Sequence, residues 1–296
     1  MKAAIIDLGS NSARMSIAEL SPGGVKILEN YRTVVRLSEG MGDEKMLKPE
    51  AVERTLDIIR EFKKIIDENN ISEVRAVATA ALRTAANREL FTEPLKEIGI
   101  KFEIISGEKE AYYDYMAVVN TLNVKNGLII DIGGASTELI LLEDGINTEM
   151  VSIPMASVNI TEKYFKNTVA TDDETEYAVG KFTKQLEKIS WLKRAETFDL
   201  IGLGGSVRAI AMFKNNTADL HGFSMTKEEV FELSAGISKM PIEERVKING
   251  VGKGRADIIL GGVVPLIAVM KYIGSEKLIS CVTGLREGIM YDIVKK

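Results

Sequence analysis

The sequence has little of the residue types on which several catalytic and structural chemistries depend. Its 296 residues include a single cysteine, Cys281, and a single histidine, His221. One cysteine excludes an internal disulfide, and one histidine excludes a metal centre built from several histidines. Catalysis by a serine–histidine pair would have to depend on His221 alone.

Long apolar runs are also missing. The longest candidate, 258–270, is shorter than the roughly 18 residues of a membrane-spanning helix. The chain starts with Met-Lys, four apolar residues and Asp7, which is typical of a strand and lacks the apolar core of a signal peptide. We therefore expect a cytoplasmic protein that does not bind a membrane.

The net charge of −5 argues against a surface that binds nucleic acid through its overall field. A phosphate-rich substrate would need local cations and a metal ion to offset this acidic background. Candidate cations lie near turns of glycine or other small residues: Arg83, Arg88, Arg208, Lys253, Arg255 and Arg286. For each of them, a solvated surface charge is the alternative.

One short pattern occurs twice at a constant offset: an aspartate ends an apolar run, a turn of small residues follows, and a second apolar run begins. Each copy predicts two strands joined by a tight turn whose outward N–H groups bind an anion. Asp7 and Asp131 at the strand ends suit a hydrated Mg²⁺ beside the phosphate, with Mn²⁺ as the alternative. The turn residues predicted to bind phosphate are Gly9, Ser10, Asn11, Ser12, Gly133, Gly134, Ala135 and Ser136.

Apolar periodicity around these hairpins predicts alternating helices and strands. Residues 13–20 alternate as a half-exposed strand, and the hairpin at 128–142 is apolar enough to be covered on both faces. Helices are predicted from Pro49, from about Asn87, at 107–122, 172–190, 206–213, 226–239 and 254–272, and from about Gly284; strands are predicted at 74–79, 100–105, 198–202 and 277–282. We expect two domains, 1–123 and 124–296, with the helix at about 284–296 able to pack back on the first.

Three acidic residues and one glycine-rich turn carry the chemistry expected of this chain. Glu110 lies in the first turn of a helix, where the helix dipole stabilises a carboxylate that can orient water; a plain N-terminal helix charge is the alternative. Asp131 and Glu138 can face one cation across the turn, although Asp131 could instead only cap it. A third anion site is predicted where a strand, a glycine-rich turn and a helix N-terminus follow one another, at Gly204, Gly205 and Ser206.

Seven segments along the chain resemble, in order, those of the exopolyphosphatase/guanosine pentaphosphate phosphohydrolase (Ppx/GppA) family. They are DLGSNS at 7–12, VRLSEGM at 35–41, ATAALR at 78–83, ISGEKEA at 105–111, DIGGASTE at 131–138, LIGLGGSVRAIA at 200–211 and TGLREGI at 283–289. The resemblance covers essentially the whole chain and is closest to the short form of the family. It implies an α/β fold of two actin-like (ribonuclease H-like) domains, with mixed sheets flanked by helices and an interdomain cleft.

The resemblance also implies roles for particular residues. Glu110 matches the family's catalytic base and Arg83 its phosphate-clamping arginine. The metal pair expected from the residues themselves is Asp131 and Glu138, with Asp7 joining through water. The sequence departs from the family at Lys109, which is normally acidic, at Ala135, which replaces a third glycine, and at 154–156, where a basic residue is missing.

Taken together, these features predict an exopolyphosphatase that releases orthophosphate from inorganic polyphosphate, with guanosine pentaphosphate as a second substrate. A homodimer is left open, and no nucleic-acid partner is expected. One alternative is an ATP-dependent kinase or ATPase of the same superfold. Another is an actin-like protein that assembles when it binds a nucleotide.

Overall fold

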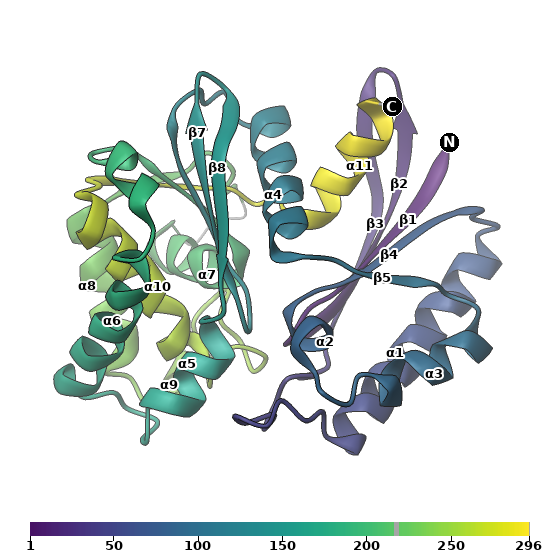
Figure 1. The fold of residues 1–296 in the computed structure, drawn as a ribbon, viewed down its shortest axis with the longest axis horizontal. Helices are drawn as coiled ribbons and strands as arrows, with labels where there is room; N and C mark the ends of the chain where they lie inside the picture. The colour runs from purple at the N-terminus through teal and green to yellow at the C-terminus, as the bar shows by residue number, and fades with distance from the viewer. Residues whose placement is uncertain (216–218, 296) are drawn as a thin grey trace. The chain divides into compact units, whose positions relative to one another are not determined.

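The computed structural model describes residues 1–215 and 219–295, and the chain folds into two compact α/β units. The first unit comprises Met1–Ala117 together with Leu285–Lys296, and the second comprises Val118–Gly284. Each unit contains one mixed sheet with helices on its faces (Figure 1).

The first unit is built on a five-stranded sheet in the order β3-β2-β1-β4-β5. Neighbouring strands among β1, β2 and β3 pair antiparallel, whereas β4 pairs parallel with both β1 and β5. The strands are β1 (Lys2–Leu8), β2 (Ser12–Ser21), β3 (Gly24–Val34), β4 (Glu73–Ala78) and β5 (Phe102–Ile104).

Helices cover both faces of this sheet. Successive residues of β1 point to opposite faces, so the strand is buried on both sides. Ile6 and Leu8 join the core under the helices that follow β3 and β4, and Ile5 joins a second core on the other face. Pro49 begins the first helix, where a proline gives up no helical hydrogen bond. The helices are α1 (Pro49–Glu68), α2 (Ala80–Thr84), α3 (Glu89–Ile98), α4 (Gly107–Thr121) and α11 (Leu285–Lys295).

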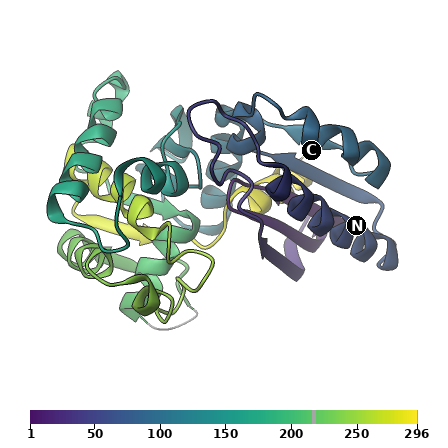
Figure 2. The same ribbon diagram turned by 90° about the horizontal axis from the view of Figure 1, so that it is seen from below.

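The last helix, α11, packs on the strands formed by the start of the chain, although the two are far apart in the sequence (Figures 1 and 2). Ile289 and Met290 share a core with Ile5. This helix explains why the prediction of a half-exposed strand at 13–20 is wrong. Ser16 is fully buried because α11 covers the face on which it lies.

The second unit has a six-stranded sheet in the order β10-β11-β9-β6-β7-β8. β6, β7 and β8 pair antiparallel, β9 pairs parallel with β6 and β11, and β10 pairs antiparallel with β11. The strands are β6 (Gly127–Ile132), β7 (Thr137–Glu143), β8 (Ile146–Ile153), β9 (Leu200–Leu203), β10 (Ser224–Thr226) and β11 (Lys277–Ser280). As predicted, the β6–β7 hairpin is almost wholly buried.

One helix of the second unit, α10, is buried along nearly its whole length, which accounts for its apolar sequence on all sides. The helices are α5 (Ser157–Tyr164), α6 (Asp172–Leu186), the 3₁₀ helix η1 (Ser190–Ala195), α7 (Gly204–Asn215), α8 (Lys227–Ser238), α9 (Ile242–Arg245) and α10 (Ile259–Ile273). The helix predicted at 254–272 begins only at Ile259, because residues 249–257 form turns.

The two sheets share one topology. Reading β8-β7-β6-β9-β11 beside β3-β2-β1-β4-β5 gives the same order and the same strand directions, with β10 as an added edge strand. The hairpins β1–β2 and β6–β7 therefore occupy equivalent places. This confirms the predicted α/β class with two actin-like units, while the interdomain cleft stays a prediction.

None of the described helices is both long enough and apolar enough to cross a membrane.

Candidate active site

The turn between β1 and β2 is held in shape by its own carbonyl groups. The N–H of Gly9 donates to the carbonyl of Ser12 at 3.0 Å and closes the turn. The carbonyls of Ser10 and Asn11 accept main-chain N–H groups from the segment that follows β3, at 3.0 Å each. Because these carbonyls are engaged, the turn has a fixed conformation in which Ser10, Asn11 and Ser12 are buried.

The turn between β6 and β7 closes in the same way, with Gly133 N–H donating to the carbonyl of Ser136 at 3.1 Å. A Cβ on Gly133 would lie 3.0 Å from that carbonyl oxygen, so the turn favours glycine. The start of α5 holds the rest of the turn: Val158 N–H donates to the carbonyl of Gly134 at 2.7 Å, and Asn159 Nδ2 donates to the carbonyl of Ala135 at 2.9 Å. The two predicted phosphate turns therefore share one geometry.

Asp131 and Glu138 are register partners next to the turn of the β6–β7 hairpin. Glu138 is fully buried, and Ser152 on β8 donates its hydroxyl to Glu138 Oε1 at 2.7 Å. Two carboxylates placed directly opposite each other destabilise a sheet unless a cation offsets them.

This pair fits Mg²⁺, which usually takes one or two protein carboxylates and completes its shell with water and substrate phosphate. Within residues 1–215 and 219–295, no cluster of three or more histidine, cysteine, aspartate or glutamate side chains is placed to hold a metal ion. A two-carboxylate site needs no such cluster.

The third predicted anion site lies where β9 leads into α7. Gly204 has φ +87°, and a Cβ there would lie 2.6 Å from Asp131 Oδ1, so only glycine fits beside the carboxylate pair. The guanidinium of Arg255 packs on Gly205, where any side chain would clash with it. The hydroxyl of Ser206 faces Gly262 of α10, so the group that Ser206 can offer to an anion is its backbone N–H.

Glu110 and Arg83 form a mostly buried ion pair in the first unit. Arg83 Nη1 donates to Glu110 Oε2 at 3.0 Å and to the carbonyl of Ile105 at 3.0 Å. The side chains are 22% and 10% exposed for Arg83 and Glu110, respectively. The structure therefore brings together the two residues predicted to be catalytic, Arg83 on α2 after β4 and Glu110 on α4 after β5.

The residues around Glu110 place it at the start of α4. Ser106 accepts Lys109 N–H at its hydroxyl, 3.1 Å away, and Glu110 N–H at its carbonyl, 3.0 Å away. Lys109, at the position that departs from the family pattern, pairs with Glu103 at 2.9 Å. That hydrogen bond raises the pKa of Lys109.

Asp7 lies in a row of charged residues, of which the sequence predicted only Asp7 and Arg286 as candidates for the site. Asp7 pairs in register with Arg14, and Arg14 pairs in register with Arg32. Arg286 on α11 reaches the same face and donates to the Ser16 hydroxyl at 2.7 Å. We call Arg14, Arg32 and Arg286 the arginine cluster.

Charge in this region is unbalanced in favour of cations. Desolvation raises the pKa of the Asp7 carboxyl, against the attraction of Arg14 and Arg286. Desolvation, together with repulsion from Arg14 and Arg286, lowers the pKa of Arg32. Such a cluster attracts a multivalent anion. Arg14 could have been found from the sequence, because the hairpin turn fixes Arg14 opposite Asp7.

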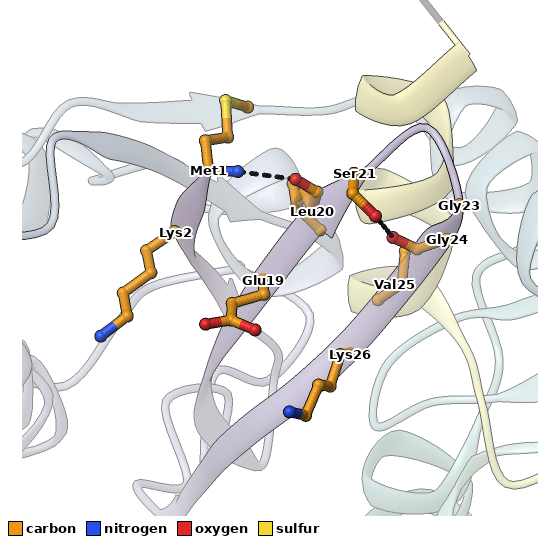
Figure 3. Close-up of a pocket in the computed structure, with 9 residues that line it drawn as sticks. All are labelled: Met1, Lys2, Glu19, Leu20, Ser21, Gly23, Gly24, Val25 and Lys26. Carbon is orange, nitrogen blue, oxygen red and sulfur yellow. Dashed lines mark hydrogen bonds between the residues drawn. The ribbon is translucent and has the colours of Figure 1, made fainter.

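The remaining predicted cations differ in their surroundings. Arg88 and Lys253 are exposed, Arg208 is half-buried and Arg255 is buried. A separate hollow of about 470 Å³ lies at the far end of β1 from Asp7, lined by Lys2, Glu19 and the β2–β3 turn (Figure 3). It contains none of the predicted site residues.

Comparisons with known proteins agree with the resemblance read from the sequence. The model of the Ppx/GppA phosphatase family matches residues 16–296. The chain is 31% identical to a guanosine-5'-triphosphate,3'-diphosphate pyrophosphatase of Photobacterium profundum, over 99% of this chain and 59% of that protein. It is 32% identical to a bifunctional 3-dehydroquinate synthase/phosphatase of Fusobacterium nucleatum, over 93% of this chain and 44% of that protein.

A solved structure of an Aquifex aeolicus member of the Ppx/GppA family superposes with a TM-score of 0.80. It is 32% identical to this chain, and the match covers 100% of this chain and 98% of that one. The chain thus spans between 44% and 59% of the two curated relatives named above, but nearly all of this crystallised relative.

Proposed function

Because the chain belongs to the Ppx/GppA phosphatase family, we propose that it is a phosphoanhydride hydrolase that releases orthophosphate from the end of inorganic polyphosphate. The observation that carries the proposal is the 3.0 Å pair between Arg83 and Glu110, two residues that lie far apart in the sequence. The guanidinium fixes the orientation of the carboxylate, as a base that orients water requires.

In this proposal Glu110 orients the attacking water and accepts its proton. The water oxygen bonds to the terminal phosphorus, and the bond from phosphorus to the bridging oxygen breaks in line with the attack. Arg83, fixed by the carbonyl of Ile105 as well as by Glu110, clamps the terminal phosphoryl oxygens. The products are orthophosphate and a chain shortened by one phosphate.

Asp131 and Glu138 would hold Mg²⁺, with Mn²⁺ as the alternative, and Asp7 would contribute through water. The bound cation neutralises charge on the transferred phosphoryl group. Glu138 keeps its orientation because Ser152 occupies one of its oxygens.

The turns at 9–12 and 133–136 and the N-terminus of α7 at 204–206 would bind phosphate oxygens through backbone N–H groups. The arginine cluster and Arg255 would bind further phosphates of the polyphosphate. Their positive charges would offset the protein's net charge of −5. A polyanion is thus the substrate class that suits these residues. We place the protein in the cytoplasm, where such substrates occur, and leave a homodimer open.

Inorganic polyphosphate is the first candidate substrate because no residue described above specifies guanine. Guanosine pentaphosphate is the second, and the name of the relative from Photobacterium profundum favours it. The same site would remove its terminal 5'-phosphate.

Side-by-side assays of phosphate release test the proposal. Polyphosphate, guanosine pentaphosphate and ATP are offered separately, each with Mg²⁺ and with Mn²⁺. The proposal expects release from at least one of the first two at a kcat/KM well above that for ATP. Turnover of ATP alone would support the kinase or ATPase alternative, and light scattering that rises on ATP addition would support an assembly protein.

A further inference from the structure

Three successive carbonyl groups of the turn at 133–136 accept hydrogen bonds from the first turn of α5. The hydroxyl of Ser157 donates to the first carbonyl, that of Gly133, at 2.7 Å, and the Ser157 N–H donates to the same oxygen at 3.3 Å. The second and third carbonyls accept the Val158 N–H at 2.7 Å and Asn159 Nδ2 at 2.9 Å. The first turn of α5 therefore holds every carbonyl on one side of this turn.

The engaged carbonyls decide where the N–H groups of the turn point. The peptide bonds here are trans, so the C=O of one residue and the N–H of the next point in opposite directions. The N–H groups of Gly134 and Ala135 follow carbonyls that face α5, and both therefore point to the opposite side of the turn. Successive main-chain N–H groups directed to one side form a concave anion site.

The backbone of the turn does not produce these directions by itself. One way to line up successive N–H groups is to alternate right-handed and left-handed residues. Ala135, which stands where the family has a third glycine, is not among the described residues with positive φ, and Gly133 has no positive φ either. The contacts with α5 therefore take the place of a left-handed residue in fixing the N–H groups.

The helix α5 is itself fixed on the buried helix α10. A Cβ on Gly261 would lie 2.4 Å from the carbonyl oxygen of Ser157, so the two helices are in close contact at this point. The hydroxyl of Thr161 accepts the Gly261 N–H at 2.9 Å and adds a hydrogen bond to the same junction. The first turn of α5 is thus a firm support for the turn at 133–136.

Asn159 uses both ends of its side-chain amide. Oδ1 accepts the Ala156 N–H at 2.8 Å and caps α5, while Nδ2 donates to the carbonyl of Ala135. Because the cap sets the orientation of the amide, Nδ2 is held toward the turn. Without this donor, the Ala135 carbonyl would be free to rotate toward the side of a bound anion, which its negative end repels.

We propose that Ser157 and Asn159 are positioning residues that direct the N–H groups of Gly134 and Ala135 toward a phosphate group of the substrate. This inference rests on the proposed function, since it assumes a phosphate-rich substrate at that turn. Neither side chain touches the substrate, because both lie on the α5 side of the turn. Each acts through the peptide group whose carbonyl it binds.

Ser157→Ala and Asn159→Leu each remove a donation to the turn and add no charge. Lys163→Met, at an exposed position of the same helix, is the matched control. We expect each of the first two to raise KM for polyphosphate about 10-fold or more, since a shift of about 1 Å in a positioning group can cost up to about 10²-fold. The control should stay within about twofold. A parental KM in either variant would overturn the role of that residue.

A variant that keeps the helix cap separates positioning from loss of stability. Asn159→Asp retains the acceptor for the Ala156 N–H but has no donor for the Ala135 carbonyl. We expect it to unfold at the urea concentration of the parent or above, because an acidic residue is favourable in the first turn of a helix, and still to raise KM about 10-fold or more. A parental KM for this variant would refute the positioning role of Asn159.

Amide NMR shifts of the unmodified protein give a readout that needs no variant. Orthophosphate, the proposed product, is added until it fully inhibits the release of phosphate from polyphosphate. The amide protons of Gly134 and Ala135 should then move downfield as they bind phosphate oxygens, and unchanged shifts would overturn the inference. A parent protein that releases no phosphate from polyphosphate or guanosine pentaphosphate would instead refute the proposed function, so the two failures are distinguishable.

Discussion

Replacement of Glu110 by glutamine tests the proposed catalytic base most directly. Glutamine has nearly the same shape and can still accept the hydrogen bond from Arg83 Nη1, but it cannot take a proton from water. Loss of a general base typically lowers the rate by about 10²- to 10⁴-fold. This equals about 3 to 5 kcal/mol of transition-state stabilisation.

The structural cost of the same change is much smaller. The pair is mostly buried, with side chains 22% and 10% exposed for Arg83 and Glu110, so its hydrogen bond is only partly screened by solvent. Exchange of a charged acceptor for a neutral one at the same distance costs about 1 to 2 kcal/mol. The variant should therefore fold, and its lost activity should greatly exceed its lost stability.

The assay measures phosphate release from polyphosphate under kcat conditions, with urea unfolding of the same preparations. Glu108→Gln is the matched control, because Glu108 lies in the same first turn of α4 but is exposed. We expect that control to retain activity within about twofold. Full phosphate release by Glu110→Gln would show that another group activates the water, and the assigned role would have to be abandoned.

Three further predictions follow from single contacts. Ser152→Ala should weaken Mn²⁺ binding, measured calorimetrically, about 10-fold or more, because Glu138 loses its orienting hydroxyl. Thr148→Ala on the same strand removes a hydroxyl that binds Glu143, outside the carboxylate pair, and should not weaken it. Equal affinities of the two variants would contradict this. Gly204→Ala should destabilise the protein well beyond Gly145→Ala, since both have positive φ (about 1 to 2 kcal/mol of strain) but only Gly204 would contact Asp131; similar urea midpoints would refute the clash. Asp7→Asn should be more stable than the parent at neutral pH and equal to it at low pH. Its raised folded pKa makes the native state bind a proton more tightly than the unfolded state, so the parent loses stability as pH rises from the ordinary value of 3.8 through the folded pKa. Parallel urea-stability curves against pH would refute that sign.

Local sequence patterns predicted the parts of the fold and site whose determinants lie close together in the chain. The two hairpins have apolar runs, a small-residue turn and an aspartate within eight positions, and the turns close alike at Gly9 and Gly133. Arg83 lies on α2 and Glu110 on α4, the helices that follow β4 and β5, and the parallel pairing of β4 with β5 brings these helices together. Such cases need only a local pattern and the ordinary rules of sheet topology.

Contacts between distant segments could not be predicted in this way. Ser16 looked solvent-exposed from its alternation, but α11, which begins some 270 positions later, covers it through Arg286. The eight-residue helix α5 was missed because it is too short to show periodicity, although its first turn holds the turn at 133–136 in place. Arg245 gave no signal at all, since a buried arginine bound to two carbonyls has no local pattern.

The duplicated hairpins show how one backbone geometry can serve opposite charges. Asp7 and Asp131 occupy the same place in their hairpins, and each has a register partner seven residues later: Arg14 for Asp7 and Glu138 for Asp131. An aspartate opposite an arginine, with Arg286 close by, leaves that end of the first sheet positive and suited to phosphate. An aspartate opposite a glutamate leaves the same end of the second sheet negative and suited to a divalent cation. The residue opposite the aspartate, an arginine in one hairpin and a glutamate in the other, therefore sets the sign of the charge beside each turn.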